Sequence, residues 1–411
     1  MSARIAHALD RLATLREDPR TPILLVIAGG WSLSLGVRLV YPAVIPHLRT
    51  AYGISLSTAG LLLTVLWLAY AIGQLPGGIL ADRLGERRVL VASTFISGAT
   101  LGLVVVAGAV EVLFAATVLF GLSTALYGVA RFTILTEVYP DNDGTAIGVT
   151  MAAGDLGNAV LPPFAGFLAV TFAWQFGFAF AVPLFLLAGV GLFVALPRSD
   201  RQRAMASSDD APEEPWLTRT AATVRRVASA LRSRPVAVVT AIQTLGYCAW
   251  QALTGFYPTY LIDVKGFAPT TATLLFGGFF ALGVVVKPLA GRAYDASGIR
   301  TTLPVILGVA GVGLVLLPFV DSLPGILLVT LLLSSILGYS TVTLTHLTAS
   351  LPAAVRGSGL GVLRTGYMVI GAGSPVVAGL LADADLFDEV FFILAALVAV
   401  GACLTVLLSE G

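Results

Sequence analysis

Four ionisable side chains lie well inside long apolar segments of this sequence: Arg38, Arg131, Asp155 and Arg364. An ionised group at the centre of a bilayer costs about 2.5–3.5 kcal/mol on insertion scales, so each position predicts either a function or a specific partner. The segment around Arg38 contains no acidic residue. Its guanidinium has five hydrogen-bond donors that suit a carboxylate or a phosphate. We therefore expect Arg38 to contact an anionic substrate, or else an acidic residue from another segment.

Arg131 and Asp155 lie in consecutive apolar segments. If these segments are antiparallel helices, the helical rise places both residues roughly 10–16 Å from the same membrane face. This placement predicts a structural ion pair, and it leaves open a role for Asp155 in proton coupling. The same rise places Arg38 roughly 24 Å from that face, so we do not expect Arg38 and Arg131 to bind one carboxylate together.

Polar and aromatic side chains recur at helical spacing in four of the apolar segments. Residues at i, i+3, i+4 and i+7 share one face of a helix, and a polar face of a membrane helix should point away from lipid. Packing is the ordinary role of such tyrosines and tryptophans, and an isolated histidine is usually just hydrogen-bonded. With Arg38 and Arg131, the candidate substrate-binding residues on these faces are Tyr41, Tyr127, Tyr247, Trp250, Gln251, Tyr339 and His346.

These polar faces need membrane-spanning helices to carry them, and the composition predicts such helices. Of 411 residues, 57% are hydrophobic and only 11% are charged, whereas a soluble domain has about 25% charged residues. About 20 apolar residues cross the hydrocarbon core as a helix. The sequence predicts an all-α polytopic membrane protein with twelve transmembrane helices, at approximately 22–46, 55–80, 89–109, 112–138, 144–170, 174–196, 235–261, 269–290, 302–320, 323–349, 357–382 and 387–408.

The second half of the sequence repeats the first at an offset of 213 residues, as from Thr58-Ala59 to Thr271-Ala272. We therefore predict two parallel, pseudo-symmetric six-helix bundles, residues 22–196 and 235–411. A segment of residues 1–21 precedes them, and a linker of residues 197–234 joins them. The linker pattern after Trp216 indicates an amphipathic helix on the membrane surface, with a solvated connector as the alternative. The same offset superposes Gly53 on Gly266, Gly78 on Gly291, Asp82 on Asp295, Gly85 on Gly298 and Pro162 on Pro375.

The basic residues are distributed unevenly between the two sets of connections. One set, which includes both the N-terminal segment and the linker, carries 18 of the 24 lysines and arginines, and the opposite set holds only Arg49 and Lys265. Loops rich in lysine and arginine stay in the cytoplasm. We therefore expect a multi-pass protein of the plasma membrane with both termini cytoplasmic.

The loop after the second predicted helix reads GGILADRLGERR. Together with the parallel repeat, it resembles the major facilitator superfamily, whose signature loop is G-x-x-x-D-[RK]-x-G-x-[RK]-[RK]. The second half keeps this skeleton but has Ala296 at the first basic position. The resemblance covers nearly the whole chain. It implies a secondary transporter that moves a small solute by alternating access, with the first, fourth, seventh and tenth helices lining a central cavity.

The candidates for gating or coupling are five charged residues, three of them in or beside this loop and two in later helices: Asp82, Arg83, Arg87, Asp155 and Arg364. Asp82 could face the positive N-terminus of the helix that begins near Gly357, and Arg364 could reach down to pair with it. We hypothesise that Asp82 and Arg364 latch the outward-open state. The alternative is that Asp82 bonds within its own loop and Arg364 extends to the membrane interface.

The excess of buried cations over buried acids favours uptake or exchange of a small organic anion. The alternative is proton-coupled export of amphipathic or cationic compounds, for which Asp155 would matter more. The fifth predicted helix resembles the signature of drug/proton antiporters, but Asn158 follows Gly157 where that signature has proline. A sensor or scaffold that transports nothing is a third class, and the intact signature loop and the polar faces argue against it.

No sequence pattern predicts catalysis. The sequence has no P-loop, no Cys/His cluster at metal-binding spacing and no nucleophile with a nearby base, so we expect neither an enzyme nor a cofactor or metal site. The net charge of +1 argues against a nucleic-acid partner. We expect a monomer whose partners are the bilayer, a small-molecule substrate and, if transport is coupled, a proton or another ion.

Overall fold

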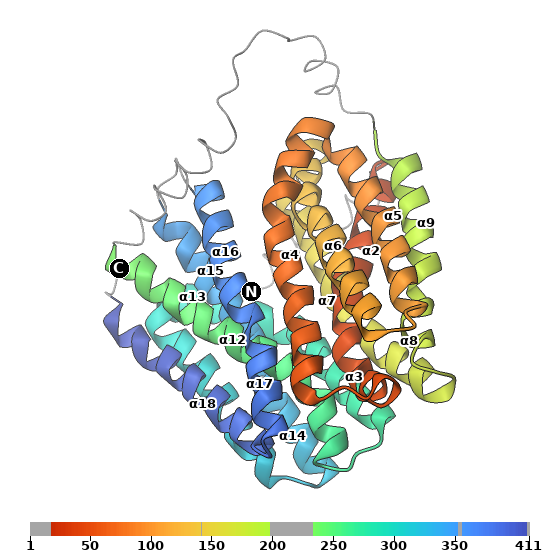
Figure 1. Cartoon of the computed structure of the whole chain (residues 1–411). Helices are drawn as coiled ribbons and strands as arrows, with labels where there is room; N and C mark the ends of the chain where they lie inside the picture. Colours follow the sequence, from red (N-terminus) through yellow and green to blue (C-terminus); the bar gives the residue numbers. More distant parts are fainter. Residues whose placement is uncertain (1–17, 141, 198–232, 352–355, 409–411) are drawn as a thin grey trace. The chain divides into compact units, whose positions relative to one another are not determined.

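The computed structural model of the chain describes residues 18–140, 142–197, 233–351 and 356–408, and every regular element in them is helical (Figure 1). Within these residues, ten helices are long and apolar enough to cross a membrane. One of the ten, Pro269–Phe319, holds two spans because its backbone leaves the helical conformation at Gly298. Helix α7 (Asp143–Thr171), with 29 residues, adds another. The all-helical fold with twelve transmembrane helices is therefore confirmed.

The chain divides into two compact units. Unit 1 comprises Met1–Val40 and Ile72–Asp209. Helix α2 packs against α6, α7 and α9, and α5 packs against α6 and α9. In the described part of unit 1 the elements are α2 (Thr21–Gly36), η1 (Val37–Leu39), the second half of α4 (Leu56–Leu84), α5 (Glu86–Val105), α6 (Val110–Val138), α7, α8 (Phe176–Ala179) and α9 (Ala181–Ala195).

Unit 2 comprises Tyr41–Ala71 and Asp210–Gly411. Helix α12 is its centre and packs against α13, α15, α16, α17 and α18. The described elements are α3 (Val40–Tyr52), the first half of α4, α12 (Arg234–Asp263), α13 (Pro269–Leu316), η2 (Leu317–Phe319), α14 (Leu323–Ser334), η3 (Ser335–Gly338), α15 (Tyr339–Ser350), α16 (Arg356–Ala372), α17 (Ser374–Asp383), α18 (Phe387–Leu404) and η5 (Thr405–Leu407).

The sequence repeat is also a repeat of structure. Four pairs of helices begin at the same offset: α2 and α12 at Thr21 and Arg234, α4 and α13 at Leu56 and Pro269, α6 and α14 at Val110 and Leu323, and α7 and α16 at Asp143 and Arg356. The glycines with positive φ in the described residues form two pairs at that offset, Gly53 with Gly266 and Gly85 with Gly298. Glycine adopts this conformation without steric penalty, so these glycines form the tight turns between the helices.

Residues 41–71 belong to the first half of the repeat, yet their contacts join them to unit 2. Arg49 forms an ion pair with Asp263. The carboxylate of Asp383 accepts hydrogen bonds from the backbone N–H groups of Leu56 and Ser57, both at 2.8 Å. Backbone packing is close as well, because a Cβ atom at Gly60 would lie 2.3 Å from the carbonyl oxygen of Pro375. The predicted division into bundles of residues 22–196 and 235–411 follows the repeat and stays a prediction.

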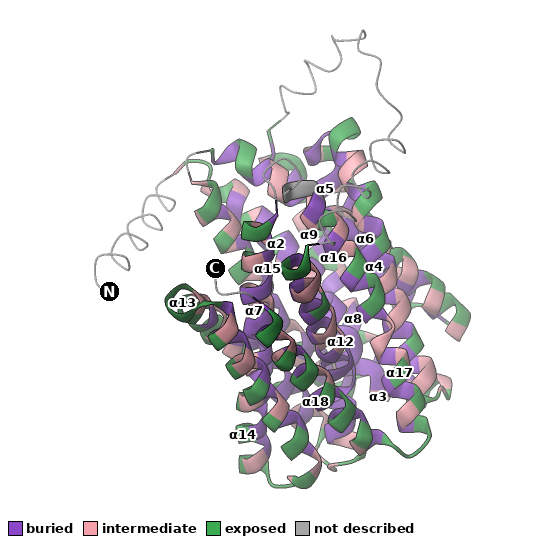
Figure 2. Ribbon diagram, turned by 90° about the vertical axis from the view of Figure 1, so that its left-hand side faces the viewer, coloured by how far each residue is buried: buried purple, intermediate pink, exposed green. Residues whose placement is uncertain are grey.

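Many of the exposed side chains on these helices are large and apolar, as expected of surfaces that face lipid. Examples are Leu187, Val194, Leu274 and Val284, all more than half exposed. Buried and exposed positions alternate around the helices (Figure 2). The predicted N-terminal segment up to residue 17 and residues 198–232, which carry the predicted amphipathic helix, lie outside the described residues.

Candidate functional site

Two guanidinium groups lie against one indole ring inside unit 1. The guanidinium carbon of Arg131 lies 3.3 Å from the centroid of the Trp31 ring, and that of Arg38 lies 5.9 Å from the same ring. Arg38 is 0% exposed and Arg131 is 1% exposed. A desolvated cation–π contact contributes about 2 kcal/mol. We call Trp31, Arg38, Tyr127 and Arg131 the unit 1 cluster.

The polar atoms of the cluster are held by contacts from three helices. Arg38 donates through Nε to the carbonyl of Ser34 at 2.9 Å, and Arg131 contacts the sulfur of Met151 through Nη2 at 3.4 Å. Tyr127 stacks on Trp31, with ring centroids 6.5 Å apart, and donates its hydroxyl to the carbonyl of Ile27 at 2.8 Å. These contacts fix the orientation of the rings and of both guanidinium groups.

Unsatisfied polar atoms lie beside the same ring. Trp31 Nε1 and Ser34 Oγ are buried and have no hydrogen-bond partner among the residues that the structure describes. Trp31, Ser34 and Arg38 are spaced at i, i+3 and i+7, so they share one face of the helix. Buried polar atoms are nearly always hydrogen-bonded. The two atoms therefore call for a hydrogen-bond partner that the described residues do not supply.

A second cluster of aromatic side chains surrounds Arg364 in unit 2. Tyr247 packs against Trp250 at 5.6 Å and against Tyr367 at 5.1 Å between ring centroids. Trp67 meets Trp250 edge-on at 5.9 Å. The charge of Arg364 interacts with the hydroxyl groups of three tyrosines, Tyr70, Tyr247 and Tyr367. We call Arg364 and these aromatic residues the unit 2 cluster.

Two buried glutamines lie beside the unit 2 cluster. Gln243 accepts a hydrogen bond from Thr343 at Oε1 and lies against Tyr339 and Tyr367. Its Nε2, like both amide atoms of Gln251, has no hydrogen-bond partner within the described part of the chain. Gln243, Tyr247 and Gln251 are spaced by four residues on α12, so they follow one face of that helix.

In both units, an aromatic ring of the cluster packs closely against a glycine on a neighbouring helix. A Cβ atom at Gly154 on α7 would lie 2.4 Å from Trp31 Nε1, and one at Gly371 on α16 would lie 2.3 Å from the Tyr247 ring. A similar contact joins the fourth membrane-spanning helix of each half to the first helix of that half. Tyr127 lies against Gly30, and Tyr339 lies against Gly246. Each half therefore places its aromatic residues through matched glycine contacts.

Some predicted site residues are not part of either cluster. Tyr41 is fully buried in α3. His346 lies on α15 with its Nδ1 atom 3.2 Å from the hydroxyl of Tyr294, and the two rings meet edge-on. His346 thus has the simple hydrogen-bonded environment of an isolated histidine.

The candidate gating and coupling residues differ in their surroundings. Asp82 and Arg83 are exposed in the last turn of α4. Arg87 donates to the carbonyl of Phe193 at 2.6 Å and lies over the ring of the same residue, which attaches the start of α5 to the end of α9. Asp155 is half-buried on α7, directly after Gly154. The Arg131–Asp155 pair and the latch between Asp82 and Arg364 both stay predictions.

The predicted site lacked several residues of these surroundings, among them Trp31, Trp67, Tyr70, Gln243 and Tyr367. Helical spacing contained a signal for Trp31, Gln243 and Tyr367. Trp31 stands seven residues before Arg38, Gln243 stands four before Tyr247, and Tyr367 stands three after Arg364. Trp67 and Tyr70 had no such signal, because both come from α4, a helix with no predicted binding residue.

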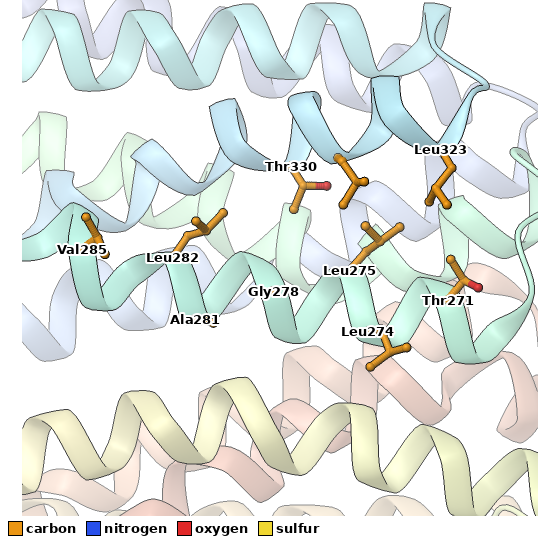
Figure 3. Close-up of a pocket in the computed structure, with 10 residues that line it drawn as sticks. Thr271, Leu274, Leu275, Gly278, Ala281, Leu282, Val285, Leu323 and Thr330 are labelled. Carbon is orange, nitrogen blue, oxygen red and sulfur yellow. The ribbon is translucent and has the colours of Figure 1, made fainter.

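An apolar pocket of about 570 Å³ lies between α13 and α14 (Figure 3). Its walls are mainly leucines and valine, including Leu274, Leu282, Val285 and Leu323. Leu274 and Val285 are 65% and 57% exposed, so the pocket opens on an apolar surface. It contains no charged side chain and none of the predicted site residues. The pocket suits hydrocarbon and does not suit an ion.

Comparisons with known proteins agree with this architecture. A sequence profile of the Major Facilitator Superfamily matches residues 26–277 and 239–410. The chain is 26% identical over 373 residues to the probable sulfoacetate transporter SauU of Cupriavidus necator, covering 87% of this chain and 86% of that protein. It is 26% identical over 345 residues to the cis,cis-muconate transport protein of Acinetobacter baylyi, covering 82% and 81%.

A solved structure shares the fold. A bacterial homologue of the human lysosomal transporter Spinster, in an inward-facing and occupied conformation, superposes with a TM-score of 0.75 at 16% identity, covering 94% of this chain and 96% of that one. The profile match spans nearly the whole chain. The chain therefore belongs to the Major Facilitator Superfamily and is a multi-pass membrane transporter rather than an enzyme.

Proposed function

We propose that the chain carries a small organic anion across the membrane, by uptake or exchange, through alternating access. The observation that carries the proposal is the unit 1 cluster, in which Arg38 and Arg131 lie against Trp31 within membrane-spanning helices. A guanidinium stays charged in any surroundings and matches the geometry of a carboxylate. The relatives named for sulfoacetate and for cis,cis-muconate support the same class of substrate, because both compounds are small dianions at neutral pH.

Arg38 is the residue we assign to the substrate. The hydrogen bond from its Nε to Ser34 holds the guanidinium in one orientation. The unsatisfied Trp31 Nε1 and Ser34 Oγ lie on the same helix face and offer two further hydrogen-bonding atoms. Charge-assisted hydrogen bonds from a fixed donor set provide both affinity and selectivity for an anion.

Uptake into proteoliposomes tests the proposal. Labelled sulfoacetate and cis,cis-muconate are the probes, and counter-transport from preloaded vesicles measures exchange. We expect Arg38→Gln to abolish transport and Arg38→Lys to retain a part of it, since lysine keeps the charge but loses the planar set of donors. Arg292→Gln is the matched control, because Arg292 is an exposed cation on α13. Unchanged transport in Arg38→Gln, or no transport of any small anion by the wild type, overturns the proposal.

Proton-coupled export of amphipathic or cationic compounds is the competing function, and the half-buried Asp155 beside Gly154 favours it. Under that function, Asp155→Asn abolishes efflux driven by a pH gradient, while Arg38→Gln leaves it intact. Under the anion proposal, Asp155 would be the group that couples a co-transported proton. Asp155→Asn then removes the pH dependence of anion uptake but leaves exchange active.

We also propose that the protein works as a monomer in the plasma membrane with both termini in the cytoplasm. The uneven distribution of lysine and arginine supports this orientation. The test places a single cysteine at Ala109 or at Ser233, with Cys248 and Cys403 replaced by alanine. A membrane-impermeant maleimide added to intact cells should label the first position and spare the second. Light scattering of the purified protein measures its oligomeric state.

A further inference from the structure

Arg364 is a cation in a membrane-spanning helix. It lies two turns into α16, and among the described residues no carboxylate forms an ion pair or hydrogen bond with it. The groups that interact with its charge are the hydroxyls of Tyr70, Tyr247 and Tyr367. Neutral hydroxyls do not balance a positive charge. Because a charge inside a membrane is costly, such a residue is a candidate functional site.

The tyrosines around Arg364 are held in place by packing. Tyr247 lies between Trp250 and Tyr367, and its ring fits against Gly371, where any larger residue would collide with it. Closely packed aromatic side chains beside a cation are more typical of a binding site than of an arginine that extends to the membrane interface. Aromatic faces also suit a flat, conjugated chain.

Two buried glutamines on one face of α12 supply amide donors near the unit 2 cluster. Gln243 and Gln251 are each 1% exposed, and Nε2 of each has no hydrogen-bond partner in the described part of the chain. Gln243 lies against Tyr367, and Gln251 is one turn beyond Tyr247. Unsatisfied buried amides in a native structure call for a ligand or a water. Every one of these groups can donate a hydrogen bond.

We propose that Arg364, Tyr70, Tyr247, Tyr367 and Gln243 form an anion-binding site inside unit 2 that takes a carboxylate or sulfonate group of the transported anion. Arg364 supplies the charge, and the tyrosine hydroxyls and the Gln243 amide supply neutral donors. The inference rests on the proposed function, since it takes the transported anion as the ligand. It differs from the predicted latch, in which Arg364 has Asp82 as its partner.

Binding to the purified full-length protein tests this site. The probes are labelled sulfoacetate and cis,cis-muconate, measured at equilibrium in detergent. We expect Arg364→Gln to weaken binding about 10- to 100-fold, the range for loss of a charged hydrogen-bonding partner. Tyr247→Phe and Tyr367→Phe remove one hydroxyl each and should weaken binding about three- to tenfold. Arg292→Gln removes a cation of the same unit from an exposed position and should leave binding unchanged.

The melting temperature without ligand separates a binding role from a structural role. A half-buried cation that has no acidic partner among the described residues costs stability in the empty protein, so Arg364→Gln should melt at the same temperature as the wild type or higher. If Arg364→Gln and Arg364→Lys both lower the melting temperature while the tyrosine variants bind normally, Arg364 is structural and the inference is wrong.

The remaining outcomes separate this inference from the proposed function. If the wild type binds neither probe nor any other small anion, the proposed function fails and this site fails with it. If the wild type binds, Arg38→Gln weakens binding and Arg364→Gln leaves it unchanged, only the unit 2 site is refuted. Asp82→Asn should leave binding unchanged. If it instead changes binding as much as Arg364→Gln does, the latch explains Arg364 and the site is refuted.

Discussion

The guanidinium carbon of Arg131 lies 3.3 Å from the centroid of the Trp31 indole, although the two residues are a hundred positions apart in the sequence. Arg38 approaches the same ring from two helical turns further along the chain. Trp31 therefore contacts two buried cations. Like charges repel at close range, and a ring whose negative face attracts both of them offsets part of that repulsion.

Replacing this ring should affect both stability and transport. Trp31→Leu removes two cation–π contacts, and we expect it to lower anion uptake about tenfold and to lower the melting temperature. Trp31→Phe keeps an aromatic face and should retain most of both. Uptake into proteoliposomes and thermal unfolding measure the two effects. Trp174→Phe is the control, since Trp174 packs edge-on against Phe178 elsewhere in unit 1. Equal activity of Trp31→Leu and wild type would exclude the bridging role.

The glycines beneath the rings give a prediction with a control in the same helix. Gly154→Ala places a methyl group 2.4 Å from Trp31 Nε1, whereas Gly148→Ala on α7 meets no atom within 4 Å. We expect the first to destabilise unit 1 by about 1–3 kcal/mol and the second to stabilise its helix by about 0.5–1 kcal/mol.

The corresponding pair in unit 2 tests whether the two halves use the same device. Gly371→Ala places a methyl group 2.3 Å from the Tyr247 ring, and Gly361→Ala on α16 meets nothing within 4 Å. Thermal unfolding should show the same contrast in both pairs, with a lower melting temperature for Gly154→Ala and Gly371→Ala and a higher one for Gly148→Ala and Gly361→Ala. If all four variants unfold alike, the rings are free to move and the glycines do not position them.

The number and order of the helices could be predicted from the sequence because lipid leaves few alternatives. Long apolar segments must be helices, and the offset from Gly85 to Gly298 identified two turns at which the glycine has a positive φ in the structure. The expected difference in depth between Arg38 and Arg131 did not predict that both contact Trp31. Helical rise gives the position of a backbone atom along the helix axis, whereas an arginine side chain extends several ångströms from it, so both guanidinium groups can lie near one ring.

Helical spacing could indicate that Tyr367 lies beside Arg364, but it could not predict the neighbours that come from other helices. A cation in a helix can extend to the interface, pair with an acid or bind a ligand, and each produces the same sequence pattern. The choice depends on neighbours from α4, α12 and α16 that meet only in the folded chain, such as Tyr70, Tyr247 and Tyr367. The grouping of residues 41–71 with unit 2 likewise depends on contacts that the repeat does not encode.

Asp383 should stabilise that grouping. Its carboxylate accepts two backbone N–H groups at the start of α4, where a helix has unsatisfied donors and a positive partial charge. We expect Asp383→Ala to lower the stability of the protein by about 1 kcal/mol, as for other helix caps, and Asp383→Asn to lower it by less. Asp385→Asn makes a similar change in an exposed residue two positions away and serves as the control. Identical melting temperatures for Asp383→Ala and the wild type would show that water replaces the cap without loss.

The latch between Asp82 and Arg364 is testable by the population of states rather than by binding. If Asp82 stabilises the outward-open state, Asp82→Asn removes a charge-assisted contact that exists only in that state. About 1.4 kcal/mol would then change the ratio of outward-open to inward-open molecules about tenfold. Spin labels on cysteines at Ala109 and Ala268, with Cys248 and Cys403 replaced by alanine, report the distance distribution on the side opposite the signature loop.

Asp295 provides the control for this measurement. It is the repeat counterpart of Asp82 and is also exposed, so Asp295→Asn makes the same chemical change at the matching turn of the second half. A shift in Asp82→Asn that Asp295→Asn does not share assigns the effect to the first loop. Arg364→Gln should shift the distribution in the same direction as Asp82→Asn if the two residues form one contact, because removing either partner removes the same interaction. A distribution that stays at the wild-type ratio in Asp82→Asn refutes the latch, and Asp82 then serves only its own exposed turn.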